Sequence, residues 1–127
     1  MSDAKISNIQ VSVDSAYIAS SSEPEAARYV FAYSITIKNT GDIEAQLITR
    51  HWVITDANGK TQEVHGEGVV GEQPHIQPGE SFEYTSGTII ETSVGAMQGS
   101  YDMVDSEGKK FTAIIPPFSL SIPRTLH

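Results

Sequence analysis

The segment Tyr29-Val30-Phe31-Ala32-Tyr33-Ser34-Ile35-Thr36-Ile37-Lys38 decides the fold class of this chain. Its large apolar side chains fall at every second position, with mostly small or polar side chains between them. Because successive side chains of a strand point to opposite faces, this period of two predicts a β-strand with one buried face.

The same period recurs on both sides of that segment. Further predicted strands span residues 9–17, 45–55, 61–65, 82–90, 97–103, 111–115 and 118–122. Turn sequences separate them, at 39–42, 56–59, 78–79 and 105–108,. No segment has a helical period. Seven or eight short strands with regular turns predict an all-β, immunoglobulin-like or fibronectin type III-like antiparallel β-sandwich, in one domain spanning residues 1–127.

The third predicted strand, residues 45–55, carries the single tryptophan. Its alternation places Trp52 on one face with Ile48, Arg50 and Ile54. The other face is expected to carry Leu47, Thr49, His51 and Val53. Immunoglobulin-like sandwiches have a Trp on the third strand and a Tyr near a core position of the sixth, and Trp52 and Tyr101 match those places. As large core residues, they would also suit another all-β fold. The double proline 116–117 is expected at a sheet edge or a kink.

Composition argues against several classes of function. Sixteen acidic residues outnumber eight Lys and Arg, for a net charge of −8. Such a balance disfavours binding to nucleic acid or to an anionic membrane. The chain has no cysteine, so it can form neither a disulfide nor a cysteine-based metal or redox site,. It has neither an apolar signal sequence nor a run long enough to span a membrane, so we expect a cytoplasmic protein.

Residues 65–74, here called the glycine loop, lie in the long connection between the predicted strands 61–65 and 82–90. It contains a G-x-G-x-x-G pattern at Gly66, Gly68 and Gly71, the spacing that holds a pyrophosphate in dinucleotide-binding folds. That kind of site needs a helix after the glycines. Prolines at 74 and 78 prevent a helix here,.

The side chains of the glycine loop also disfavour a phosphate site, because Glu67 and Glu72 would repel the anion. We predict that the loop is a bulged crossover between the two sheets, with Val69 and Val70 packed inward. An anion-binding nest formed by the backbone amides of the three glycines is the alternative.

The four histidines show no H-x-H or H-E-x-x-H spacing,. His65 and His75 bracket the glycine loop and could meet Glu67 or Glu72 in space, which makes these four residues candidate metal ligands. Solvated side chains explain the same residues without a metal, and we predict no cofactor. There is no G-x-S-x-G motif, no cysteine nucleophile and no carboxylate pair placed across a cleft, so we predict that the chain is not an enzyme.

Several segments, in order along almost the whole chain, resemble the ApaG family. They are Arg50-x-Trp52-x-Ile54-Thr55-Asp56, Val64-x-Gly66-x-Gly68-Val69-Val70-Gly71-x-x-Pro74, Ile76-x-Pro78-Gly79-x-x-Phe82-x-Tyr84-x-Ser86-Gly87, Gly95-x-Met97-x-Gly99-x-Tyr101-x-Met103 and Pro123-x-x-Leu126-His127. The resemblance implies a fibronectin type III-like or immunoglobulin-like sandwich that stands alone in bacteria. It also implies kinship with the carboxy-terminal domain of some eukaryotic F-box proteins and of a polymerase-delta-interacting protein.

The resemblance further implies a link by name to cobalt resistance and magnesium efflux, and by gene neighbourhood to diadenosine tetraphosphate hydrolysis. Neither link defines a biochemical activity. Our hypothesis is a non-enzymatic protein-interaction module with an unidentified protein partner, docking around residues 65–75 and at Arg50, His51, Glu67 and Glu72. The alternative is a binder of a nucleotide polyphosphate or a divalent cation at the glycine loop. An open sheet edge would allow a monomer or a homodimer.

Overall fold

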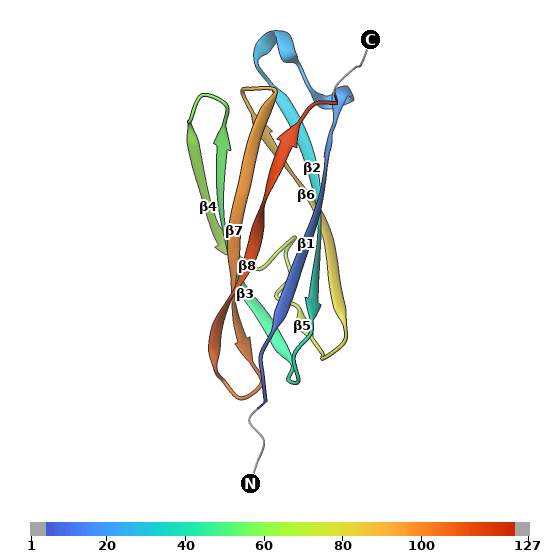
Figure 1. Cartoon of the computed structure of the whole chain (residues 1–127), viewed down its shortest axis with the longest axis vertical. Helices are drawn as coiled ribbons and strands as arrows, with labels where there is room; N and C mark the ends of the chain where they lie inside the picture. The colour runs from blue at the N-terminus through green and yellow to red at the C-terminus, as the bar shows by residue number, and fades with distance from the viewer. Residues whose placement is uncertain (1–4, 124–127) are drawn as a thin grey trace.

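The computed structural model describes residues 5–123, which form two antiparallel sheets packed face to face (Figure 1). The first sheet has the order β1-β2-β6, and its strands are β1 (Ile9–Tyr17), β2 (Tyr29–Asn39) and β6 (Ser81–Ile90). The second has the order β4-β3-β7-β8, and its strands are β4 (Thr61–Glu67), β3 (Ala45–Asp56), β7 (Val94–Asp105) and β8 (Lys110–Ser121). The two-residue strand β5 (His75–Ile76) pairs with the start of β3. The predicted antiparallel β-sandwich is confirmed.

The remaining elements of the described part of the chain are two short 3-10 turns between β1 and β2, namely η1 (Ala19–Ser21) and η2 (Pro24–Ala26). Within residues 5–123 no helix is long and apolar enough to cross a membrane. One side of the sandwich is closed where β1 lies against β8, and there the Ser15 hydroxyl donates to the carbonyl oxygen of Ser119 at 3.0 Å. Both β4 and β6 are edge strands of their sheets on the other side.

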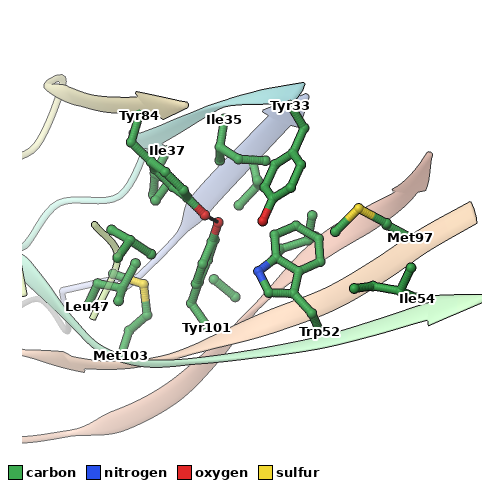
Figure 2. Packing of buried hydrophobic residues seen from close by; sticks show 14 of the residues in the cluster. Tyr33, Ile35, Ile37, Leu47, Trp52, Ile54, Tyr84, Met97, Tyr101 and Met103 are labelled. Carbon is green, nitrogen blue, oxygen red and sulfur yellow. Dashed lines mark hydrogen bonds between the residues drawn. The ribbon is translucent and has the colours of Figure 1, made fainter. Parts of the chain in front are cut away.

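The inner faces of the two sheets form one apolar core. As predicted, alternate residues of β2 point into it, and Phe31, Tyr33, Ile35 and Ile37 are buried. The opposite sheet supplies buried side chains including Leu47, Trp52, Ile54, Met97, Tyr101 and Met103 (Figure 2). The rings of Tyr33 and Trp52 meet edge to face across the core, with centroids 5.2 Å apart, a favourable geometry for two aromatic rings.

Two tyrosine hydroxyls meet in the middle of this core. Tyr84 of β6 and Tyr101 of β7 are hydrogen-bonded to each other across the two sheets (Figure 2). Burial raises the pKa of Tyr84 to about 12 and also raises the pKa of Tyr101. In the immunoglobulin tyrosine corner the hydroxyl bonds instead to backbone a few residues upstream. The immunoglobulin-like or fibronectin type III-like variety of sandwich therefore stays a prediction.

A β-bulge in β3 corrects the predicted faces of that strand. The pairing of β3 with β7 shifts register between Leu47 and Thr49, which leaves Ile48 as the extra residue. The extra residue reverses the alternation, so Leu47 is fully buried in the core together with Trp52, whereas the simple period of two placed them on opposite faces,. Ile48 is only half-buried.

A second irregularity lies in the edge strand β8, where the double proline Pro116-Pro117 sits at a shift in register opposite Met97 to Gly99. Its position on an edge strand is the one predicted. The strand continues through it, however, so the two strands expected at 111–115 and 118–122 are one. Edge prolines are tolerated because the outer side of such a strand needs no ladder donor.

Candidate functional site

The glycine loop joins β4 to β5, and both of these strands pair with β3. The chain therefore stays in the second sheet through the whole loop. The predicted crossover between sheets occurs later, at the Gln77-Pro78-Gly79-Glu80 turn, where the Glu80 amide donates to the Gln77 carbonyl oxygen at 2.9 Å. The prediction of a crossover inside the glycine loop was wrong because the pairing of Ile76 with Ala45 holds the end of the loop beside β3.

Backbone amides of the glycine loop are already engaged. The Gly68 amide donates to the carbonyl oxygen of Ile48 at 2.8 Å, and Val69 and Glu72 exchange two backbone hydrogen bonds. Gly68 has a φ of 63°, and a side chain at this position would collide with the carbonyl oxygen of Glu72. The glycine at this position therefore serves a tight turn. Three amides of the loop therefore already donate to carbonyl oxygens. The candidate anion site at Gly66, Gly68 and Gly71 stays a prediction.

Arg50 fastens the glycine loop from its inner side. Its Nη1 donates to the carbonyl oxygens of Glu67 and Gly68, at 3.0 and 2.9 Å. The guanidinium lies so close to Gly66 that a Cβ there would contact it at 2.7 Å. Arg50 shares the face of Trp52, as predicted, but its donors face the loop rather than a free outer surface. Arg50 therefore supports the predicted docking surface by holding the loop in place, not by facing a partner.

The tip of the loop presents an exposed valine in an unusual conformation. Val70 and Gly71 have φ angles of 43° and 82°, and the two bonds between Val69 and Glu72 close a tight turn around them. Positive φ at both central residues is the signature of a type I′ turn. Val69 is buried, as predicted, but Val70 is 56% exposed. The expected inward packing of Val70 was wrong because residues at the tip of such a turn project away from the chain.

The structure separates the two histidines that bracket the loop. His75 lies opposite Gln46 and its Nδ1 is 2.9 Å from Oε1 of Glu44. His65 lies opposite His51, and their rings stack with centroids 4.2 Å apart and 10° between planes. His65 and His75 pair with different parts of β3, so they do not share a site. His127 is outside the described residues.

Glu63 joins the stacked histidines, and sequence reasoning missed it. His51, Glu63 and His65, here called the histidine–glutamate cluster, each offer a ligand atom, and these atoms lie within 4.8 Å of one another. The hairpin register brings the two histidines together. His51 and His65 each lie seven positions from Asn58 in the turn, so they face each other across the paired strands. The Asp-Ala-Asn-Gly turn at 56–59 could have given this pairing from sequence alone.

The other predicted docking residues are accessible. Glu67 and Glu72 are exposed, and His51 is half-buried on the outer face of the second sheet. Between the edge strands β4 and β6 lies a groove of about 560 Å³, lined among others by Tyr33, Arg50, Trp52, Val64 and Gly87. Arg50 thus lies between this groove and the glycine loop.

Known proteins resemble this chain along its whole length. The family model described as the ApaG domain matches residues 19–105. Proteins named ApaG from Thiobacillus denitrificans and Azoarcus sp. are 59% and 56% identical over 127 residues, covering all of both chains. The crystal structure of a protein described as ApaA from Bordetella pertussis has a TM-score of 0.92 and 47% identity, covering 97% of this chain and all of that one. None of these names states an activity.

Proposed function

The chain belongs to the ApaG domain family, and from that premise we propose that it is a non-enzymatic protein-interaction module. The docking surface is the tip of the glycine loop, with the exposed Val70 as an apolar contact and the exposed Glu67 and Glu72, which flank it in the sequence, as charged contacts. The partner is a protein that offers an apolar recess bordered by basic side chains, because such a surface complements a valine between two carboxylates. The module acts in the cytoplasm.

The observation that carries the proposal is the fixed but strained tip of the loop. A β-branched residue with positive φ is an outlier that costs free energy, and such strain is found at functional sites. The surrounding contacts maintain it: Val69 is buried, and Arg50 donates to two loop carbonyls. The side chain of Gln73 adds a bond to the Ile48 carbonyl oxygen at 2.9 Å. A loop fixed before binding loses little conformational entropy when a partner docks.

The absence of an enzymatic role is supported by where the perturbed ionisable groups lie. Catalytic acids and bases have shifted pKa values inside clefts. Within residues 5–123 the raised pKa values belong to Tyr84 and Tyr101 inside the core. The lowered pKa of Asp105 comes first from the hydrogen bond donated by the amide of Lys109, the residue that follows the turn at 105–108. These positions serve packing and turn geometry.

The test compares partner capture by three forms of the purified chain. The loop variant carries Glu67→Lys and Glu72→Lys. The matched control carries Glu25→Lys and Glu107→Lys, which makes the same change in charge at exposed sites outside the loop. We expect a protein from the native cell to be retained by the wild type and the control and lost by the loop variant, and calorimetry with that purified protein to reproduce the order. Equal retention by all three forms, or by none, contradicts the proposal.

A link to cation efflux would then run through the bound partner and would not require a cation to bind at the glycine loop. The alternative function, binding of a nucleotide polyphosphate at the glycine loop, has a separate measurement. A ligand that prefers the folded state raises the melting temperature. Thermal unfolding with millimolar ATP or diadenosine polyphosphate tests this alternative, and an unchanged melting temperature eliminates it.

Light scattering of the wild type decides between a monomer and a dimer joined through the edge of β4 or β6.

A further inference from the structure

The histidine–glutamate cluster lies on the outer face of the second sheet, away from the core. His51 is on β3, and Glu63 and His65 are two positions apart on the neighbouring strand β4. Oε2 of Glu63 is 3.9 Å from Nε2 of His51 and 3.6 Å from Nε2 of His65. The carboxylate oxygen therefore lies within reach of both imidazoles, which is the composition of a two-histidine, one-carboxylate metal site.

His51 carries the observation that points to a ligand. Its Nε2 is shut off from solvent and has no hydrogen-bond partner among residues 5–123. A buried nitrogen without a partner is rare in folded proteins and needs an explanation such as an ion or a water. The stacked ring of His65 contributes to this enclosure, because the two rings are nearly parallel and only 4.2 Å apart.

We propose that the cluster binds one divalent transition-metal ion of the zinc type. The ligands are Nε2 of His51, Nε2 of His65 and Oε2 of Glu63, and water completes the coordination. Imidazole ligands favour Zn²⁺, Ni²⁺ and Cu²⁺, whereas Mg²⁺ and Ca²⁺ prefer oxygen ligands. The site is therefore selective against the abundant hard cations.

Binding requires a small closure of the cluster. In a tetrahedral site with bonds of about 2.0–2.1 Å, ligand atoms are about 3.3 Å apart, so the two distances to Glu63 must shorten by about half an ångström. The two rings must also turn out of their parallel stack so that both nitrogens face the ion. The side chains of His65 and Glu63 are 68% and 61% exposed and can move. His51 is 35% exposed and sits on β3, which is paired on both sides, so it provides the fixed ligand.

The test is a calorimetric titration of the tag-free chain with Zn²⁺ and, separately, with Ni²⁺. We expect one ion per chain for the wild type, and no competition from millimolar Mg²⁺. Glu63→Gln and His65→Gln each remove one exposed ligand and should weaken binding tenfold or more, since even groups behind a ligand change metal affinity by about 10–100-fold. The matched control is His75→Gln, which alters an exposed histidine beside a single carboxylate, Glu44. It should bind as the wild type does.

Nuclear magnetic resonance locates the ion independently of affinity. Paramagnetic Ni²⁺ should broaden the ring signals of His51 and His65 and leave those of His75 sharp. The proposal is overturned if the wild type binds no ion at 100 µM Zn²⁺, or if His75→Gln weakens binding as much as His65→Gln does. Val70, Glu67 and Glu72 are not ligands, so failure of the metal site leaves the partner proposal standing.

Discussion

Replacing either tyrosine of the buried hydroxyl pair alone should destabilise the protein more than replacing both together. Tyr101 is fully buried and Tyr84 is 8% exposed, and each hydroxyl is the other's hydrogen-bond partner. Tyr84→Phe leaves the Tyr101 hydroxyl in the core without that partner, and Tyr101→Phe does the same to Tyr84. A buried polar group left unsatisfied costs about 1–3 kcal/mol.

The burial of each tyrosine sets the expected order of the two single variants. Tyr84→Phe should lower the free energy of unfolding by about 2–3 kcal/mol, because it orphans the hydroxyl of Tyr101, the more deeply buried of the two residues,. Tyr101→Phe should lower it by about 1–2 kcal/mol. Replacing both partners by apolar groups of the same shape can be nearly neutral, so the double variant should lose less than about 1 kcal/mol. The coupling energy of the cycle is then at least about 2 kcal/mol.

Urea unfolding followed by fluorescence measures all four proteins, since the single tryptophan, Trp52, is buried beside Tyr33 and reports the core directly. Equal slopes of the transitions must be checked before the free energies are compared. The reasoning is refuted if the two single losses add, within about 0.5 kcal/mol, to the loss of the double variant. Additivity would mean that the hydroxyls contribute only through packing.

Three further measurements test other parts of the structure. The pKa of Tyr84 is raised from 10.0 to about 12, so the folded state holds this proton to higher pH, and the contribution of Tyr84 to stability should fall by on the order of 2–3 kcal/mol between pH 10 and 12. The raised pKa of Tyr101 adds a loss over the same range, so alkaline denaturation of Tyr84→Phe should keep only part of the wild type's fall in stability with pH. Gly99→Ala should cost about 3 kcal/mol in urea unfolding, because its Cβ would collide with the His51 carbonyl oxygen on the paired strand,; a loss below about 1 kcal/mol contradicts this close approach. Val70→Asn should raise stability by about 1 kcal/mol, since Asn tolerates positive φ better than a β-branched residue,, and it should weaken partner binding if the valine is retained for docking.

The strand pattern could be predicted from sequence because a half-buried strand shows its two faces in its composition. The alternation of β2, the turn at Pro78-Gly79 and the buried face of β7 with Tyr101 and Met103 all followed from that rule. Local spacing could not show the bulge at Ile48. A bulge depends on the partner strand, since one extra residue is defined only by what lies opposite it. One undetected residue was enough to misplace Leu47.

The candidate site was predicted less well than the fold, for a related reason. The glycine pattern identified the loop with the unusual backbone, but it did not show that β5 would hold the loop beside β3. Searching for histidine pairs at short sequence spacing missed His51 and His65, which are brought together by strand pairing across a hairpin. Cross-strand neighbours follow from the centre of a turn rather than from spacing along one segment.

The glycine loop and the histidine–glutamate cluster depend on the same strand register. In the ladder of β3 with β4, Arg50 lies opposite Gly66 on the inner face, and His51 lies opposite His65 on the outer face. A slip of one residue would turn every side chain of β4 to the other face. It would thus remove the glycine that admits the guanidinium and separate the imidazoles in the same step. The turn at 56–59, where Asp56 Oδ1 accepts two backbone amides, holds that register. Weakening this turn should therefore impair loop docking and metal binding together. In contrast, a change in Glu63 should impair only metal binding, and a change in Glu72 only docking.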